Sequence, residues 1–459
     1  MEYIIMEQQC TLRVGVQSGA RTYYIETFGC QMNVRDSETA AGLLETQGFL
    51  PAQSKEEADI ILYNTCCVRD HAEKRVFGNI GALKERKDEN PNLIIGVFGC
   101  MMQQPEVAEK LYKRFPFVNI VFGTNLLSRL PSFVEGAEAG SRTLAADADN
   151  IQIEDDLPSI RTGKANAFVN INYGCDNYCT YCIVPYVRGR ERSRQMQAIA
   201  SEAHSLIAEG YSEITLLGQN VNSYGKDLPD ASFAKLLTLV SSIEGLERIR
   251  FMTSHPKDLS DEMIETMARL PNVCRHVHLP MQSGSNEILR RMNRKYTRER
   301  YLDIVRKLRL AMPDVELTTD IIVGFPGESE EDFAQTLDLV EQVGFASAFT
   351  FKYSPRRGTQ AATMDQQVPD AVKRERLHRL NELQERKSRE NNEKYVGRTG
   401  VVHVEDCDTK NSPVCHGKFS NFKMVYFPGS PDLVGRYVPV TVDGVRKNSL
   451  YGTPEDRKQ

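Results

Sequence analysis

The chain has 459 residues, of which 41% are hydrophobic and 26% charged, and its net charge is -5. This length predicts two or three domains, and the composition is typical of a soluble globular protein. The acidic balance excludes a protein coated in basic surface, although local basic patches can still bind nucleic acid. No run reaches the roughly 20 apolar residues of a membrane helix, and residues 1–10 do not resemble a signal peptide. We therefore expect a cytoplasmic protein without membrane contact.

The first predicted domain covers residues 22–135 and alternates apolar runs with segments of helical period. The apolar runs span residues 23–30, 58–67, 93–100 and 118–124. Strand and helix in alternation predict a parallel α/β sheet. The following residues, 136–164, are rich in Gly, Ala and Asp and lack a clear period, so we expect a linker there.

The second predicted domain, residues 165–394, contains six further apolar runs separated by helical segments. The runs begin at Ala167, Glu213, Arg248, His276, Glu316 and Ser347. Six β/α units with buried strands favour an α/β fold in the form of a partial (β/α)6 barrel. Its last segment is a charged helix. Short β-like runs in residues 395–457 then predict a small all-β barrel.

Three of the eleven cysteines, Cys175, Cys179 and Cys182, form a C-x3-C-x2-C pattern after the first barrel strand. Clustered thiols in a reducing cytosol indicate metal binding rather than a disulfide framework. Three thiolates suit a cubic [4Fe–4S] cluster whose fourth iron stays open to a small ligand. Zinc is an alternative, but a structural zinc site takes four ligands and no fourth is near. Packing cysteines are the remaining alternative. Loops after barrel strands carry active sites, which favours the cluster.

A second group, Cys30, Cys66 and Cys100, lies at the ends of three apolar runs in the first domain. The ends of parallel strands meet at one edge of a sheet, so these thiols are predicted to converge. The alternative is that they pack as small hydrophobic residues. Cys67 adjoins Cys66, and spacing alone does not choose between them. The remaining cysteines are interpreted as packing or surface residues: Cys10, Cys274, Cys407 and Cys415.

The cysteine triplet resembles that of the radical S-adenosylmethionine superfamily, and the chain from about residue 22 to 451 resembles the methylthiotransferases within it. The motifs that carry this resemblance are "TFGCQMN", "NTCCVRDHAEKRVFGNIG", "GCMMQ", "CTYCIVPYVRGRERSR", "HLPMQSGSNEILRRMNRKYT" and "DIIVGFPGE". The C-terminal segment resembles the RNA-binding domain called TRAM. The family pattern assigns Cys30, Cys66 and Cys100 to a second [4Fe–4S] cluster and selects Cys66 over Cys67.

The resemblance implies that the open iron at the triplet binds S-adenosylmethionine, which is cleaved to a 5'-deoxyadenosyl radical. Residues after the later barrel strands would line that pocket: Gln219, Asn220, Gln282, Ser283 and Gly324. The implied reaction replaces C2–H of an isopentenylated adenosine at position 37 of tRNA by a methylthio group, using two S-adenosylmethionine molecules. Methylthiolation of threonylcarbamoyl-adenosine or of a ribosomal protein side chain is an alternative. A non-catalytic electron carrier is a third, but carriers complete all four ligands.

The expected partners are the anticodon stem-loop of tRNA, an electron donor such as flavodoxin or ferredoxin, and a sulfur donor, with the chain acting as a monomer. Four arginines follow the triplet and predict a phosphate clamp: Arg188, Arg190, Arg192 and Arg194. Salt bridges to acids are their alternative role. Near the C-terminus, Lys418 and Phe419 lie among interleaved basic and aromatic residues, as on RNA-binding β surfaces. We expect the RNA loop to lie between the barrel mouth and the C-terminal domain.

Overall fold

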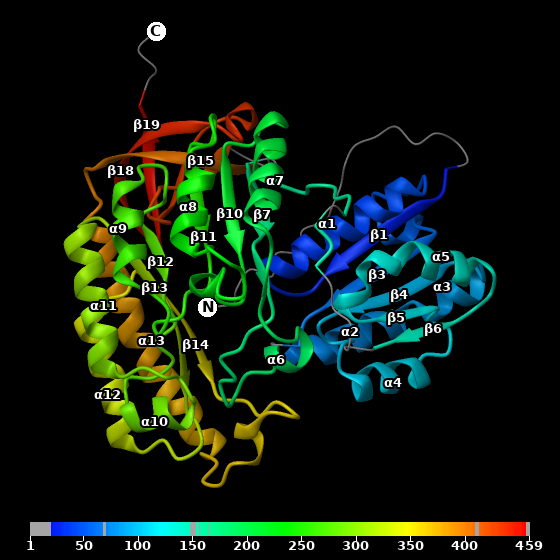
Figure 1. The fold of residues 1–459 in the computed structure, drawn as a ribbon, viewed down its shortest axis with the longest axis horizontal. Helices are drawn as coiled ribbons and strands as arrows, with labels where there is room; N and C mark the ends of the chain where they lie inside the picture. The colour runs from blue at the N-terminus through cyan, green and yellow to red at the C-terminus, as the bar shows by residue number, and fades with distance from the viewer. Residues whose placement is uncertain are drawn as a thin grey trace. The chain divides into compact units, whose positions relative to one another are not determined.

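The computed structural model describes residues 20–67, 70–146, 153–155, 157–163, 165–408 and 413–455. The chain divides into two compact units (Figure 1). The first unit runs to residue 162 and also takes residues 173–176 and 183–192, while the second unit takes the rest. Cys10, which was interpreted as a packing or surface cysteine, lies outside the described residues.

The first unit contains a parallel sheet with strand order β2-β1-β3-β4-β5-β6. Its strands are β1 (Thr22–Thr27), β2 (Leu50–Pro51), β3 (Ile60–Thr65), β4 (Ile94–Gly99), β5 (Ile120–Phe122) and β6 (Thr143–Ala145). Its helices are α1 (Gln31–Thr46), α2 (Asp70–Ala82), α3 (Lys84–Glu89), α4 (Pro105–Arg114), α5 (Leu130–Glu138) and the short α6 (Val184–Val187). The predicted parallel α/β sheet is therefore confirmed.

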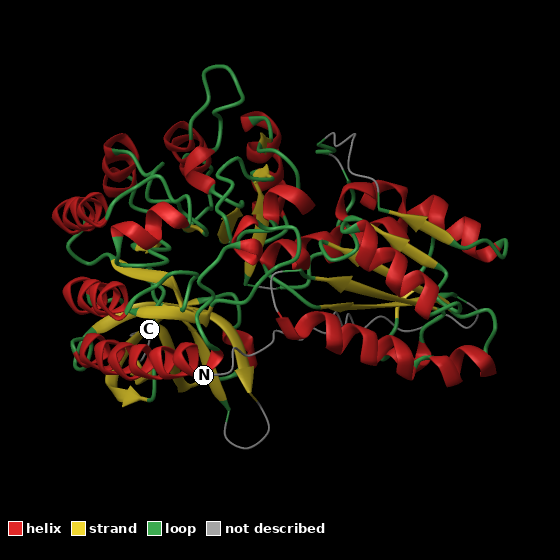
Figure 2. Cartoon of the chain, turned by 90° about the horizontal axis from the view of Figure 1, so that it is seen from below, coloured by secondary structure: helices red, strands yellow, loops and turns green. Residues whose placement is uncertain are grey.

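Helices cover both faces of this sheet, as Figure 2 shows. Successive side chains of a strand point to opposite faces, so β3 contributes to two separate cores. Ile60 and Leu62 pack on the side of α1 and α5, whereas Ile61 and Tyr63 pack on the side of α2 and α4. A strand buried on both faces reads as a continuous apolar run, which is why this strand was recognisable from the sequence.

Two of the six strands, β2 and β6, were not predicted. Both are short, and β6 lies inside residues 136–164, where we expected a linker. The end of that stretch is also ordered, because it packs along α1. Ile160 donates its N–H to the carbonyl oxygen of Glu38 at 2.9 Å, and Arg161 donates to the Glu38 carboxylate at 3.0 Å. A side chain at Gly42 would collide with the backbone of Pro158, so glycine permits this close approach.

The second unit begins with six parallel strands, which confirms the predicted partial (β/α)6 barrel. These strands are β7 (Asn166–Asn170), β10 (Glu213–Leu217), β11 (Arg248–Phe251), β12 (His276–His278), β13 (Glu316–Val323) and β14 (Ser347–Lys352). They pair in the orders β7-β10-β11 and β12-β13-β14. The helices of this unit are α7 (Met196–Ala208), α8 (Phe233–Ser241), α9 (Asp261–Arg269), α10 (Asn286–Arg291), α11 (Arg298–Ala311), α12 (Glu330–Val343) and α13 (Asp370–Glu393). The short strands β8 (Asn172–Tyr173) and β9 (Arg192–Ser193) pair with each other.

A closed β barrel follows α13 in the same unit, with strand order β15-β16-β17-β19-β18. Its strands are β15 (Thr399–Asp408), β16 (Val414–Lys418), β17 (Met424–Pro428), β18 (Tyr437–Arg446) and β19 (Ser449–Pro454). Short 3-10 helices complete the chain at Lys55–Glu57, Thr124–Arg129, Val221–Ser223, Gln360–Thr363 and Pro431–Leu433. In the described part of the chain, no helix has the length and apolar character needed to cross a membrane.

The C-terminal barrel packs against the N-terminal ends of the strands of the (β/α)6 barrel. Arg248, the first residue of β11, donates to the carbonyl oxygens of Lys418 at 2.9 Å and Val401 at 2.6 Å. His276, the first residue of β12, stacks on Phe422 with 4.4 Å between ring centroids. The mouth, by which we mean the C-terminal ends of the six strands, is at the opposite end. The C-terminal barrel therefore does not border the mouth directly, and the RNA loop expected between them would have to span the length of the strands.

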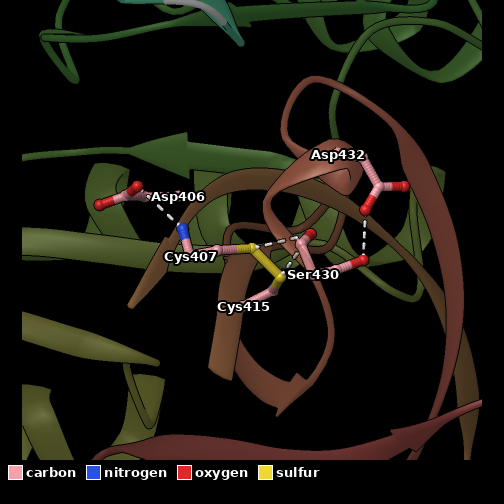
Figure 3. The surroundings of a disulfide bond; sticks show 5 residues. All are labelled: Asp406, Cys407, Cys415, Ser430 and Asp432. Atoms are coloured by element: carbon pink, nitrogen blue, oxygen red, sulfur yellow. Dashed lines mark hydrogen bonds between the residues drawn. A yellow bond between two sulfur atoms is a disulfide. The ribbon is translucent and has the colours of Figure 1, made fainter. Parts of the chain in front are cut away.

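Two cysteines of the C-terminal barrel form a disulfide, Cys407–Cys415 (Figure 3). The interpretation of these two residues as packing or surface cysteines is therefore wrong. They are directly paired across β15 and β16, and the carbonyl oxygen of Ser430 lies 3.4 Å and 3.3 Å from their sulfurs. Eight residues separate them, and only the hairpin register brings them together, so no spacing rule for metal ligands could identify the pair. Cys274, in contrast, is a buried free cysteine as interpreted.

Candidate functional site

The cysteines of the first unit follow the ends of three adjacent strands, as predicted. Cys30 follows β1, Cys66 follows β3 and Cys100 follows β4. Strand β1 pairs Thr27 with Asn64, and β4 pairs Gly99 with Thr65, so all three thiols lie at one edge of the sheet. Cys30 is exposed, while Cys66 and Cys100 are buried.

Two asparagines tie these strand ends together. Asn33 Oδ1 accepts hydrogen bonds from the N–H and the thiol of Cys30, each at 3.4 Å. Asn33 Nδ2 in turn donates to Asn64 Oδ1 at 3.0 Å, and Asn64 Nδ2 donates to the Asn33 carbonyl at 2.7 Å. Both side chains are fully buried, where an amide needs partners. The network holds the start of α1 against the end of β3, and thereby fixes the positions of two cysteine-bearing turns.

Cys67 faces Cys100, which the sequence did not indicate. The two pack together with Ile183 and Val187, and the Cys67 thiol hydrogen-bonds to the Cys100 sulfur. This hydrogen bond raises the pKa of Cys67 well above its usual value. It also lowers the pKa of Cys100 to about 6, and the positive charge of Arg188 acts in the same direction. Cys100 is therefore a thiolate near neutral pH, which is the form that binds metal.

Arg188 approaches the same sulfur, although we predicted that it binds RNA phosphate. Its Nε donates to Cys100 Sγ at 3.0 Å, and its second nitrogen donates to Asp36 Oδ2 at 2.7 Å. The Arg188 side chain is only 5% exposed. A phosphate of a bound RNA cannot replace partners that are buried inside the first unit, so the prediction for Arg188 is wrong.

The cysteine triplet is divided by the two units, with Cys175 in the first and Cys179 and Cys182 in the second. Gly174 has a φ of +73°, and a side chain there would collide with the carbonyl oxygen of Arg190, so the turn before Cys175 requires glycine. In the second unit the N–H of Cys182 donates to the carbonyl oxygen of Cys179 at 2.9 Å. Within the described residues, no group of three His, Cys, Asp or Glu side chains surrounds a single metal ion. A cubic cluster distributes its cysteines over different irons and therefore does not need that geometry.

A second buried arginine contacts the triplet. Arg294 donates to Cys179 Sγ at 3.3 Å, to the carbonyl oxygen of Pro280 at 3.1 Å and to Tyr296 Oη at 3.3 Å. Only 5% of Arg294 is exposed, and in the described part of the chain no carboxylate pairs with it. Its positive charge is therefore directed at the sulfur and at whatever binds next to it. Arg294 belongs to the basic run at residues 290–300, and the run alone did not indicate that this arginine is buried against Cys179.

Buried polar atoms without partners gather at the mouth of the (β/α)6 barrel. They come from the turns after β10, β11 and β12 and are Asn220 Oδ1, Ser254 Oγ, His255 Nε2 and Gln282 Oε1. Each of these residues is at most 6% exposed. Buried polar groups are normally hydrogen-bonded, and several orphans in one place indicate a site that a polar ligand completes. This observation supports two residues predicted to bind the cofactor, Asn220 and Gln282.

The other predicted cofactor residues differ from this pair. Ser283 Oγ already contacts Thr336 Oγ1 at 3.3 Å and accepts from the Ser285 N–H at 3.2 Å. The N–H of Gly324 donates to Glu328 at 2.6 Å. These two residues therefore shape their loops through protein contacts and do not offer a free group. Gln219 is half-buried beside Asn220 and stays a prediction.

His255 is a member of this site that sequence reasoning missed. Its Nδ1 accepts a hydrogen bond from the Lys257 N–H at 3.2 Å, which leaves the proton of the neutral ring on Nε2. Burial and the charge of Arg294 hold the pKa of His255 far below its ordinary value. The ring is therefore neutral at physiological pH and presents one N–H to the mouth. The signal in the sequence was "TSHP", a polar turn directly after a barrel strand.

The remaining residues that were predicted to contact RNA fall into two groups, one buried and one at least partly exposed. Arg194 is buried and donates to Glu202 at 2.6 Å, so it holds the start of α7 and cannot reach RNA. Phe419 is 6% exposed in the core of the C-terminal barrel, which excludes it as a stacking platform. Lys418 pairs with Glu405 at 2.7 Å and is partly exposed. Arg190, whose side chain is 79% exposed, pairs with Asp176, and the half-buried Arg192 donates to the Arg188 carbonyl.

The outer face of the C-terminal barrel carries an aromatic row, formed by His416, Tyr426 and Tyr451. His416 pairs with Tyr426 across β16 and β17, and Tyr426 pairs with Tyr451 across β17 and β19. The His416 and Tyr426 rings stack with centroids 5.3 Å apart, and the two tyrosines are 38% and 45% exposed. Period-two alternation separates this row from the buried Phe427, a distinction that the sequence alone did not make.

Comparison with known proteins matches three family models along the chain. Residues 169–340 match the radical SAM superfamily, residues 22–123 match the uncharacterized protein family UPF0004, and residues 393–454 match the TRAM domain. Among solved structures, the cobalamin-binding radical S-adenosylmethionine methyltransferase TsrM from Kitasatospora setae has a TM-score of 0.54 and 15% identity, with 75% of this chain and 74% of that chain covered. The fold and the triplet thus define a radical SAM protein with a C-terminal TRAM domain.

Proteins that are similar along nearly the whole chain identify the family within this class more closely. A tRNA-2-methylthio-N(6)-dimethylallyladenosine synthase of Caldicellulosiruptor saccharolyticus is 52% identical over 94% of this chain and 92% of its own length. One of Clostridium botulinum (strain Langeland) is 50% identical over 95% and 96%. The chain belongs to the family of tRNA-2-methylthio-N(6)-dimethylallyladenosine synthases.

Proposed function

We propose that this chain replaces the C2 hydrogen of N6-isopentenyladenosine at position 37 of tRNA by a methylthio group. The observation that carries the proposal is the presence of two cysteine sites, each with one sulfur hydrogen-bonded by a buried arginine. Relatives that match nearly the whole chain are named for this modification. An electron carrier needs only one route for electrons, whereas a methylthiolation needs separate places for radical formation and for sulfur.

The radical SAM family uses S-adenosylmethionine and a [4Fe–4S] cluster, and the triplet Cys175, Cys179 and Cys182 would hold that cluster. A second cluster at Cys30, Cys66 and Cys100 belongs to the proposal. When bound, these groups supply the radical that removes hydrogen and the sulfur that is transferred. The donor set fits, because three cysteines follow the ends of adjacent strands at one edge of the sheet and Arg188 donates to the sulfur of Cys100.

The polar atoms at the mouth would bind and orient S-adenosylmethionine. His255 offers an N–H donor, while Asn220 Oδ1 and Gln282 Oε1 offer acceptors, a combination that suits a ligand with both amine and carboxylate groups. Asn220 is held in place because its Nδ2 donates to Asp258 at 2.7 Å. A rigid set of donors and acceptors lowers the entropy lost on binding.

The tRNA would contact the aromatic row of the C-terminal barrel and the exposed Arg190. Because the C-terminal barrel packs at the end of the strands opposite to the mouth, the bound RNA has to extend along the side of the (β/α)6 barrel. Aromatic rings at the surface stack on unpaired bases, and the target base must leave its stack to reach the mouth. Arg192 and Gln219 remain candidate contacts. A flavodoxin or ferredoxin, a sulfur donor, a monomeric state and a cytoplasmic location complete the proposal.

Mass spectrometry of tRNA nucleosides from cells that lack this protein tests the function. We expect loss of the methylthio group from isopentenylated adenosine and its return when the intact gene is restored. Loss of the methylthio group from threonylcarbamoyl-adenosine instead would show a different tRNA substrate. Unchanged tRNA with an altered ribosomal protein mass would exclude tRNA as the substrate and overturn the proposal.

A further inference from the structure

The segment that follows the cysteine triplet belongs to the first unit, although the strands of the (β/α)6 barrel lie before and after it in the sequence. Residues 183–192 group with the N-terminal sheet, and two apolar side chains, one just before α6 (Val184–Val187) and one at its end, pack against Cys100 and Cys67. Ile183 and Val187 are 6% and 2% exposed. The helix ends at Arg188, whose N–H donates to the Val184 carbonyl at 2.8 Å. This anchoring fixes where the Arg188 side chain begins.

From that point the guanidinium of Arg188 bridges two buried groups. One N–H donates to Cys100 Sγ at 3.0 Å, and another donates to Asp36 Oδ2 at 2.7 Å. The side chains of Arg188 and Asp36 are 5% and 10% exposed. A guanidinium is planar and holds its donors in a rigid fork, so the ion pair with Asp36 also determines the direction of the N–H that points at the sulfur. Asp36 lies on α1 and is held by the sheet that carries the cysteines.

We propose that Arg188 is a positioning residue that hydrogen-bonds to the cysteine sulfur of the second cluster and sets its reduction potential, with Asp36 as the counter-charge. The inference rests on the proposed function, because it presumes a cluster at Cys30, Cys66 and Cys100. Hydrogen bonds to the sulfurs and the net charge near a cluster are among the factors that set its potential. Arg188 favours the reduced, more negative state of the cluster, and Asp36 opposes it.

Substitutions of the two residues are therefore expected to shift the reduction potential in opposite directions. A merely structural role of either residue would not produce such opposite shifts. The test uses the full-length chain with Cys175, Cys179 and Cys182 changed to Ala, so that any iron–sulfur signal belongs to the second site. Reconstituted protein is titrated with dithionite, and the midpoint potential of the one-electron reduction is read from its EPR signal. We expect Arg188→Gln to shift the potential to more negative values, Arg188→Lys to shift it less, and Asp36→Asn to shift it to more positive values.

Arg194→Gln is the matched control, because Arg194 is also a buried arginine in an ion pair with a carboxylate, and it donates to Glu202 and to the Asn170 carbonyl oxygen within the second unit. We expect this variant to leave the potential unchanged even if its thermal stability falls. If Arg188→Gln fails to retain iron, Asp36→Asn and Arg188→Lys still carry the test. Potentials that stay unchanged in loaded Arg188→Gln and Asp36→Asn proteins, or that shift in the same direction, overturn the inference.

Failure of the proposed function has a different signature. The parent protein without the triplet should bind about four irons and show one EPR signal on reduction. A parent that binds no iron means that the second site holds no cluster, and the proposed function then fails before any Arg188 variant is compared. A parent with its full cluster and variants with unmoved potentials leave the function intact and exclude only the role of Arg188.

Discussion

The two cysteine sites use the same kind of contact but balance its charge differently. In the first unit Arg188 donates to Cys100 and is neutralised by Asp36. In the second unit Arg294 donates to Cys179, while its other partners are a carbonyl and phenolic oxygens without formal charge. A buried arginine without a carboxylate keeps its full positive charge for the groups next to it. The comparison shows that a carboxylate pairs with the arginine of the first site, whereas the described partners of the arginine in the second site carry no carboxylate.

This difference agrees with the polar groups nearby. Unpartnered buried atoms lie at the mouth of the second unit, at Asn220, His255 and Gln282. Around the first site the equivalent amides, Asn33 and Asn64, hydrogen-bond to each other, and Asn33 also accepts from Cys30. One site is thus built to receive a small polar molecule, and the other to hold its cysteines in place.

Removing a cysteine from each site gives the largest expected effects and the sharpest separation between them. Cys179→Ala should reduce S-adenosylmethionine cleavage to background, because the cluster that binds this cofactor loses a ligand. Cys100→Ala should abolish methylthiolation and retain cleavage, both measured by chromatography of deoxyadenosine and of modified nucleosides. Cleavage lost equally in both variants would contradict the division of roles.

The next largest effect is on iron content, which distinguishes Cys66 from Cys67 as a ligand of the second cluster. Cys66→Ala should lower the iron content by about four atoms per chain, because the family pattern assigns it as a ligand. Cys67→Ala should keep the iron, because the Cys67 thiol stays protonated as a donor to Cys100. Iron and sulfide analysis of the two variants decides, and the reverse result would make Cys67 the ligand.

A substitution of Arg294 tests whether its positive charge beside Cys179 contributes to the reaction in the second unit. Arg294→Gln should lower the rate of S-adenosylmethionine cleavage roughly 10–100-fold, as is typical when a partner of a metal ligand is removed. Arg290→Gln is the control, since Arg290 lies four residues away in the sequence and pairs with Glu287 at the surface. A rate in Arg294→Gln equal to that of Arg290→Gln would show that the contact with Cys179 has no functional weight.

The smallest effect is a pH dependence of stability caused by His255. Burial lowers the pKa of His255 far below its ordinary value of 6.5, so below that pH the unfolded chain binds a proton that the folded chain does not. Stability is then lost as the pH falls below about 6.5, with a slope of at most about 1.4 kcal/mol per pH unit. His255→Asn should reduce the fall in Tm between about pH 7 and about pH 5 relative to the parent.

The exposed His378 provides the comparison for this measurement. His378→Asn removes a histidine at an exposed position and should preserve the acid sensitivity of the parent. Equal curves for both variants would mean that His255 is not the group responsible.

The sequence predicted the architecture well because the buried strands are long apolar runs that end in cysteine or in polar turns. All six barrel strands and the four inner strands of the first sheet were recognisable in this way. Strands β2 and β6 were missed because two or three residues at the border of a sheet carry no periodic signal. The ends of parallel strands also predicted correctly that Cys30, Cys66 and Cys100 share one edge.

The arginines were harder to interpret, because charge alone does not reveal burial. Arg188 and Arg194 are buried with Asp36 and Glu202, acids that are distant in the sequence or on another element, while Arg190 in the same run is exposed. The disulfide between Cys407 and Cys415 depended in the same way on a hairpin register that spacing does not specify. Where a function depends on which face a side chain takes, the tertiary contacts decide.

The interleaved boundary between the units has a consequence for how the chain is made. The first unit includes residues 183–192, so it is not complete when residue 162 leaves the ribosome. Domains usually fold from the N-terminus as they emerge, but here the first unit also takes in residues that are synthesised after the first strand of the second unit. Until Arg188 has been synthesised, Asp36 and Cys100 both lack the hydrogen bonds that Arg188 donates to them. Maturation of the first cysteine site is therefore tied to synthesis of the second, and a fragment that stops at the apparent linker would lack the residue that completes it.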